Sequence, residues 1–370
     1  MNSLTRYADV PGLSVLDAAR WRIDRLFKSD FPLCISLSGG KDSLCLHDLM
    51  REYVIGHPGS EKKLVVSFFD EEAVFPECRD LMLRIREQWL DLGVPFRWLA
   101  LPLKHNNCFH SLENDDTWIV FDPACPDRWV CQPPPFAETT SPLLKYPGQY
   151  NYQQMSALLF PKHLRVCGVR VFESIQRSSA FREQCKRNGG MQDFSPGILQ
   201  YPLWDWRDKD VWYHIRQRGL PYPRCYEKLF AMQGRSRLRL SQVFSIDTAK
   251  TLAHMAEYYP EFWERVCARE PNAYLAAMYY DSEMFRRAES KAADGVDRTD
   301  YKAKVWELFK SGKYAKCDAR MLLYWVVSMS VYMTNKDWAD VYRALYAGDP
   351  KRRATRSIFT RLSTYKNVTR

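Results

Sequence analysis

The stretch CISLSGGKDSLCLHDLM at residues 34–50 decides the fold of this 370-residue chain. A short apolar run breaks at two glycines, and leucines then recur at helical spacing. This pattern predicts a buried strand, a tight turn and a helix. The backbone N–H groups of such a turn converge on one point, where the positive end of the helix also lies. The stretch therefore predicts a seat for an anion.

The residues of the turn suit a phosphate. The two glycines leave room for its oxygens, the lysine adds a positive charge, and the serine hydroxyls add donors. The spacing is not that of a Walker A loop, in which four residues separate the first glycine from Gly-Lys-[Ser/Thr]. The alternative is a glycine turn without a ligand. The predicted phosphate-binding residues are Ser38, Gly39, Gly40, Lys41, Asp42 and Ser43.

Apolar patterns along the first two thirds of the chain alternate between strands and helices, which is typical of a mainly parallel sheet covered on both faces. In such sheets ligands bind beyond the carboxyl ends of the strands. Besides the strand and helix of residues 34–50, we expect strands at 63–69, 96–101, 164–169 and 198–203, and helices at 13–28, 76–92 and 210–216.

Two further regions depart from this alternation. Residues 104–155 are rich in proline, aromatic and polar residues, and we expect an ordered insertion over the active-site edge. Beyond about residue 245 only helical patterns occur, and a basic tail follows Asp349. The sequence thus predicts a nucleotide-binding domain at 1–245 and a helical domain at 246–370.

Composition limits the function classes. Lysine and arginine number 54 against 44 aspartates and glutamates, a net charge of +10 that favours anionic ligands. No apolar stretch reaches the length of a membrane span, and residues 1–9 have no apolar signal core, so we expect a cytoplasmic protein without a membrane partner. The eleven cysteines include no Cys-x-x-Cys pair, which gives zinc and iron–sulfur sites no support.

Two segments at predicted strand ends add candidate site residues. Asp70 ends the second strand, where a carboxylate can hold Mg²⁺ or orient a ribose. The alternative is a solvated acidic turn. Glu71 and Glu72 are assigned no function.

In GVRVFESIQR at 168–177, glycine permits a close backbone approach and arginine can pair bidentately with phosphate or sulfate. Its candidate residues are Gly168, Arg170, Ser174 and Arg177, with Glu173 as a partner that holds the arginines.

Two later segments have weaker signals. In YPLWDWRDKDVW at 201–212 we expect the tryptophans to pack in the core and Asp208 or Asp210 to start a helix. In RSRLRL at 235–240 the alternation would place three guanidinium groups on one face of an extended segment. That face suits a polyanion or a substrate phosphate, or it is simply solvated. The residues are Arg235, Arg237 and Arg239.

The string SGGKDS resembles the PP-loop of ATP pyrophosphatases and phosphoadenosine phosphosulfate (PAPS) reductases. Over about residues 15–245 the chain is similar to the PAPS reductase domain, which implies a Rossmann-like fold of the adenine-nucleotide α-hydrolase type. The segment 69–77 resembles that family's Asp-Thr-Gly-x-x-Phe-Pro-Glu, with Glu71 and Glu72 in place of Thr-Gly. The segments at 168–177 and 201–212 also match family patterns. The continuation of the chain beyond about residue 239 resembles a subgroup of this family that has an added C-terminal domain. Members of that subgroup tend to be encoded beside a ParB-like protein, often in phages and mobile elements.

The resemblance implies ATP, PAPS or a related adenine nucleotide as ligand. PAPS reductases also carry a catalytic cysteine in Glu-Cys-Gly-x-His, which this chain lacks; Cys317, with no histidine nearby, is the only cysteine among the last hundred residues. The leading hypothesis is therefore cleavage of ATP between the α- and β-phosphates, with adenylyl transfer to sulfate or a nucleic-acid group. Lys41, Asp42 and Arg170 would be catalytic, and Asp42 and Asp70 would bind Mg²⁺, although Asp42 could instead cap the loop helix.

Two other hypotheses remain at this point. One is a nucleotide-gated module that associates with DNA or RNA and acts with a ParB-like partner. The other is PAPS sulfotransferase or reductase chemistry without the usual catalytic cysteine.

Overall fold

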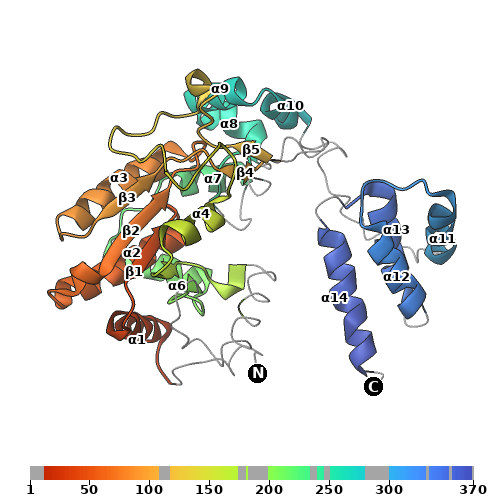
Figure 1. Ribbon diagram of the computed structural model, residues 1–370, viewed down its shortest axis with the longest axis horizontal. Helices are drawn as coiled ribbons and strands as arrows, with labels where there is room; N and C mark the ends of the chain where they lie inside the picture. Colours follow the sequence, from red (N-terminus) through yellow and green to blue (C-terminus); the bar gives the residue numbers. More distant parts are fainter. Residues whose placement is uncertain are drawn as a thin grey trace. The chain divides into compact units, whose positions relative to one another are not determined.

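The chain forms two compact units, Met1–Arg287 and Ala288–Arg370 (Figure 1). The structure is a computed structural model, and it describes residues 12–107, 117–173, 181, 199–233, 240–245, 251–279, 300–330, 333–349 and 352–368.

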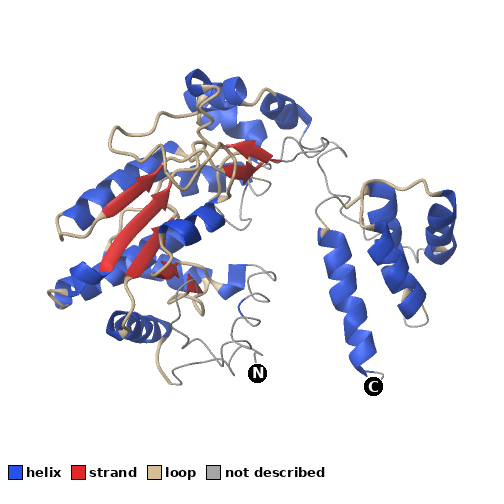
Figure 2. Cartoon of the chain, viewed as in Figure 1, coloured by secondary structure: helices blue, strands red, loops and turns tan. Residues whose placement is uncertain are grey.

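A five-stranded parallel sheet is the centre of the first unit (Figure 2). Its strand order is β3-β2-β1-β6-β7, and every neighbouring pair is parallel. This confirms the predicted Rossmann-like sheet, although most strands end earlier than expected. The strands are β1 (Leu33–Leu37), β2 (Leu64–Phe69), β3 (Phe96–Leu99), β6 (Leu164–Cys167) and β7 (Leu199–Gln200).

Helices cover both faces of this sheet because alternate residues of each strand point to opposite sides. Leu33, Ile35 and Leu37 of β1 pack in one buried cluster with four helices, whereas Cys34 packs on the other face with Met155 of a fifth helix. The first four are α1 (Val15–Lys28), α2 (Lys41–Gly56), α3 (Pro76–Leu90) and α6 (Asp208–Arg218), and the fifth is α4 (Tyr152–Leu159).

One buried histidine in this core makes stability depend on pH. His47 of α2 bonds to Gln88 and stacks edge-on against Trp89, and burial lowers its pKa from 6.5 to about 4. The unfolded chain therefore binds the proton first as the pH falls. We expect the free energy of unfolding to decrease by about 3 kcal/mol between pH 6.5 and 4 on this account. Denaturant melts across that range should show a shallower decrease for His47→Gln, and equal slopes would contradict the assignment.

The predicted insertion is partly buried and partly exposed where the structure describes it. It contains the antiparallel strands β4 (Lys104–Asn106) and β5 (Thr117–Ile119) and a short 3-10 helix, η4 (Pro126–Arg128). Glu138 extends the edge of the sheet, because its N–H donates to Trp98 O and its carbonyl accepts from Ala100 N.

A buried carboxylate ties the insertion to the end of β2. Glu72 accepts hydrogen bonds from the backbone N–H groups of Phe121 (2.5 Å) and Val130 (3.1 Å) and pairs with Arg269 at 2.9 Å. These contacts give Glu72, for which the sequence predicts no function, a structural role.

The first unit continues well past residue 245. A cluster of buried side chains joins Phe75 and Trp118 to Phe262 and Trp263, which follow the last strand by some sixty residues. The loss of strand patterns near residue 245 therefore marks a change of secondary structure, whereas the compact unit ends at 287. The helices concerned are α7 (Cys225–Gln233), α8 (Leu252–Tyr258), α9 (Pro260–Arg269) and α10 (Asn272–Tyr279).

The second unit is helical. Its helices are α11 (Tyr301–Ser311), α12 (Ala319–Met329), α13 (Asn335–Ala347) and α14 (Arg353–Val368). The segment that the sequence analysis treated as a basic tail forms α14, and Ile358 anchors it in a core with Leu322, Val326 and Leu345. Among the residues that the structure describes, no helix is long and apolar enough to cross a membrane.

Candidate functional site

The strand order brings the two strongest sequence motifs together. From β1 the sheet continues through β2 and β3 on one side and through β6 and β7 on the other, so the chain reverses direction across the sheet between β1 and β6. Open parallel sheets bind ligands at such a switch point, beyond the carboxyl ends of the strands. The loop at 38–43 follows β1, and Gly168 and Arg170 follow β6.

The loop at 38–43 has the backbone that its glycines predicted. Gly39 adopts φ +73°, a conformation that L side chains rarely adopt, and Gly40 is the N-cap of α2 without a side-chain cap. The Ser43 hydroxyl accepts from the Ser38 N–H at 3.3 Å and donates to Gly40 O at 2.9 Å, which braces the turn. The positive end of α2 is thus presented without a capping carboxylate or hydroxyl of its own N-cap residue.

Gly168 serves this loop by a close approach of two backbones. A Cβ at this position would lie 2.8 Å from Asp42 O and 3.0 Å from Ser43 N, both in the first turn of α2. Only glycine lets the end of β6 lie against the start of the helix. The sequence analysis expected the close approach; the structure shows that the neighbour is the loop helix itself.

Replacing Gly168 by alanine should therefore displace the loop. We expect the free energy of unfolding to fall by about 1–3 kcal/mol, as in other overpacked sites, together with weaker anion binding at the loop. Gly56→Ala is the matched control, because a Cβ there meets nothing within 4 Å. That variant should leave stability unchanged or raise it by up to about 1 kcal/mol. Denaturant melts measure both, and equal effects would contradict the close-packing argument.

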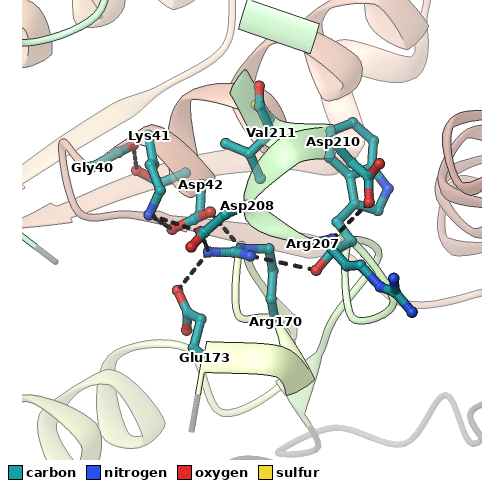
Figure 3. A network of polar contacts seen from close by, with 12 residues as sticks. Gly40, Lys41, Asp42, Arg170, Glu173, Arg207, Asp208, Asp210 and Val211 are labelled. Carbon is teal, nitrogen blue, oxygen red and sulfur yellow. Dashed lines mark hydrogen bonds and ion pairs between the residues drawn. The ribbon is translucent and has the colours of Figure 1, made fainter. Parts of the chain in front are cut away.

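Lys41 and Arg170 meet in one cluster of charges (Figure 3). Lys41 Nζ lies 3.2 Å from Asp42 and 3.6 Å from Asp208. Arg170 Nε donates to Asp42 at 2.5 Å, and Arg170 Nη2 donates to Asp208 at 2.7 Å and to Glu173 at 3.4 Å. Only 4% of the Lys41 side chain and 2% of the Arg170 side chain are exposed. Two buried cations therefore lie at the start of α2, held by three carboxylates.

Asp208 is the outermost member of this cluster. Its side chain is 59% exposed, and it bridges Lys41 and Arg170 from the first turn of α6. Burial acts to raise the pKa of Asp208, but the charges of Lys41 and Arg170 outweigh it and lower the pKa. The carboxylate thus stays ionised at neutral pH and contacts both cations from the solvent side.

Tyr226 of α7 is a site residue that sequence analysis missed. Its hydroxyl accepts from Lys41 N at 2.9 Å, and its ring lies 5.8 Å from Lys41 Nζ. Burial raises the pKa of Tyr226 well above its usual value, so the hydroxyl keeps its proton. One amide at the start of α2 is thereby satisfied by protein. No motif marks this tyrosine, because only tertiary packing brings α7 to the loop.

The contacts of Asp70 do not support its predicted role in binding Mg²⁺ or a ribose. Its carboxylate is fully buried and accepts from Arg79 (2.9 Å), Trp98 Nε1 (3.0 Å) and Glu72 N (3.2 Å). Burial raises the pKa of Asp70 despite these donors. Both oxygens of Asp42 are likewise engaged, by Lys41 and Arg170. In the described part of the chain, no group of three or more histidine, cysteine, aspartate or glutamate residues is arranged to hold a metal ion.

The remaining candidates lie outside the described residues. These are Ser174 and Arg177, which follow Glu173, and the arginines of the alternating segment, Arg235, Arg237 and Arg239.

None of the cysteines with a resolved pKa shift is activated. Burial raises the pKa of Cys167, at the end of β6, to about 11, and it also raises the pKa of Cys78 behind the loop. Cys317 in the second unit shows the same direction. Nucleophilic thiols need the opposite shift.

Comparison with known proteins adds one sequence relative and several distant structures. No family model matches the chain. Uncharacterized protein YbdN of Escherichia coli is 24% identical over 354 residues, covering 89% of this chain and 84% of the relative. A PAPS reductase from Candida auris is 15% identical with a TM-score of 0.35, covering 65% of this chain and 93% of that one. The U34-tRNA thiolase NcsA from Methanococcus maripaludis is 11% identical with a TM-score of 0.31, covering 71% and 78%.

Proposed function

We propose that the first unit binds an adenine nucleotide by its phosphates at the loop 38–43 and transfers the adenylyl group to an acceptor, with release of pyrophosphate. One observation carries the proposal: two nearly buried cations, Lys41 and Arg170, meet at the N-terminus of α2 at the switch point of a parallel sheet. Burial of paired cations is costly, and their position at a helix N-terminus suits a phosphate rather than a neutral ligand.

Each group has a task in this reaction. An acceptor oxygen attacks the α-phosphorus, the bond from that phosphorus to the bridging oxygen breaks, and pyrophosphate leaves with the electron pair. Lys41 Nζ and the positive end of α2 hold the β- and γ-phosphates, although Lys41 N itself already donates to Tyr226, while Arg170 stabilises charge that builds on the transferring group. Asp208 gives up its contacts with both cations when the phosphates enter. Asp42 keeps the two cations aligned, since it contacts both. No step is assigned to Asp70.

Sulfate and a nucleic-acid group that presents an oxygen remain the acceptors that fit the proposal. Thiol-dependent reduction of a sulfonucleotide is a weaker candidate, because burial raises the pKa of cysteines near the loop such as Cys78 and Cys167. A nucleotide-gated module acting with a ParB-like partner would use the same seat without turnover.

The test uses the purified full chain and three ligands. Calorimetric titration with ATP, PAPS and pyrophosphate measures which phosphate pattern binds, and pyrophosphate release from ATP is followed with sulfate, with single-stranded DNA or RNA, and with neither. Pyrophosphate release stimulated by one acceptor is the expected result. ATP binding without release under every condition would favour the gated module. Failure of all three ligands to bind at millimolar concentration would overturn the proposal.

A further inference from the structure

The net charge of the chain is concentrated in its second unit. Residues 288–370 contain 17 lysines and arginines against 9 aspartates and glutamates, whereas residues 1–287 contain 37 against 35. The smaller unit therefore accounts for a net charge of +8, and the larger one for +2. An imbalance of this size on a small domain generates a field that attracts polyanions.

Most of the acids that the structure describes in the second unit are engaged in structural contacts. Asp300 accepts from Ala303 N at the start of α11, Asp318 from Met321 N at the start of α12, and Asp349 from Thr355 N at the start of α14. Asp337 is buried in the capping box of α13, and Asp340 pairs with Arg343. Asp340 and Asp318, which also lies 3.4 Å from Arg352, offset part of the exposed positive charge, but the unit as a whole keeps its net charge of +8.

The lysines and arginines whose side chains the structure describes in this unit are all exposed: Lys302, Lys304, Lys310, Lys313, Lys316, Arg320, Lys336, Arg343, Arg352, Arg353 and Arg356.

Aromatic rings accompany these cations where α12 packs against α14. Tyr324, 63% exposed, meets Trp325 edge-on at 5.9 Å, and Trp325 packs on Phe359 at 4.3 Å. Arg320 lies one helical turn before Tyr324, and Arg356 lies one turn before Phe359, so each pair shares a helix face. We call Arg320, Tyr324, Trp325, Arg356 and Phe359 the α12–α14 surface.

We propose that the α12–α14 surface binds single-stranded nucleic acid. Guanidinium groups contact the phosphates, and the exposed rings stack on bases, which is the combination that sequence-tolerant single-strand binders use. A duplex keeps its bases stacked inside and would leave Tyr324 and Phe359 without a partner. An acidic protein could pair with the positive charge of this unit, but it offers no series of flat bases on which Tyr324 and Phe359 could stack. This proposal concerns the second unit and does not depend on the activity of the first.

The binding test uses the full chain and fluorescence anisotropy. A labelled 20-nucleotide single strand of mixed sequence, as DNA and as RNA, is compared with the matching duplex at several potassium chloride concentrations. We expect the single strand to bind more tightly. The logarithm of its binding constant should fall linearly with the logarithm of salt, with a slope near −0.7 for each neutralised phosphate.

Variants separate the two kinds of contact. Arg320→Ala with Arg356→Ala should weaken binding and reduce the magnitude of the salt slope by about 1.4, that is, by about 0.7 for each arginine. Tyr324→Ala should weaken binding about 5- to 150-fold at an unchanged slope, because stacking is not ionic. Tyr213→Ala, which removes a ring of α6 that is 66% exposed, is the matched control and should have no effect. Circular dichroism and thermal melts check that each variant folds.

Three results would overturn the proposal. The first is absence of single-strand binding at 50 mM salt, the second is equal affinity for the duplex with no effect of Tyr324→Ala, and the third is tighter binding to phosphatidylserine vesicles than to either strand. Lys41→Met should leave strand binding unchanged, so loss of nucleotide turnover and loss of strand binding are distinguishable.

Discussion

Lys41→Met is expected to weaken ATP binding by about 30-fold or more and to reduce pyrophosphate release to background. The side chain is nearly buried, and its ammonium would contact the β- and γ-phosphates directly. Truncating one partner of a desolvated charge pair costs about 2–5 kcal/mol, and each 1.4 kcal/mol is tenfold in affinity. Methionine preserves the aliphatic stem, so the loss of the charge rather than of packing is measured.

The control for this variant lies close by on the surface. Lys209 follows Asp208 on α6 and is exposed, so Lys209→Met removes the same charge from the neighbourhood without removing a contact in the cluster. We expect Lys209→Met to change the ATP affinity by less than about threefold, because exposed charges are screened by water and salt. If the two variants weakened ATP binding equally, only the general field of the protein would attract the nucleotide, and the loop would not be its seat.

The parts of the site that sequence could predict are those that depend on local backbone. Gly39 and Gly40 mark the turn wherever the rest of the chain lies, and the alternation of strands and helices places the ends of β1 and β6 at one edge. Arg170 could be assigned to that edge for the same reason. The contacts of Asp208 and Tyr226 with Lys41 and Arg170 could not be predicted from sequence, because they follow from how α6 and α7 pack.

Asp70 is a predicted site residue whose contacts could not be read from the sequence. A carboxylate at a strand end is a sound metal candidate when only its neighbours in sequence are known. Its actual partners, Arg79 and Trp98, come from α3 and β3, and together with Glu72 N they use the hydrogen-bonding capacity of the carboxylate inside the protein. Burial of Phe262 and Trp263 inside the first unit could not be predicted either, because a helical pattern does not say which surface the helix packs on.

Asp208→Asn is expected to tighten nucleotide binding by about tenfold. This direction is unusual, because most substitutions in a binding site weaken binding. The carboxylate lies 2.7 Å from Arg170 and 3.6 Å from Lys41, so phosphates must displace it before they can reach either cation. Removing its charge removes this competitor, and a difference of about 1.4 kcal/mol is one decade in affinity. The cluster also changes from three carboxylates around two cations to two around two.

The same substitution should leave the fold almost as stable, since a pair with a side chain 59% exposed contributes about 0–1 kcal/mol. Glu173→Gln is the matched comparison. Glu173 contacts Arg170 at 3.4 Å and its side chain is more buried, so we expect a smaller gain in ATP affinity than for Asp208→Asn.

Because the pKa of Asp208 is lowered, its charge is constant from pH 5 to 8. The ratio of the ATP affinity of Asp208→Asn to that of the wild type should therefore not change over that range. Calorimetric titration with ATP at pH 5, 6.5 and 8 measures this ratio. Weaker binding by Asp208→Asn at every pH would mean that Asp208 helps to hold the nucleotide, and would reverse its role from competitor to ligand.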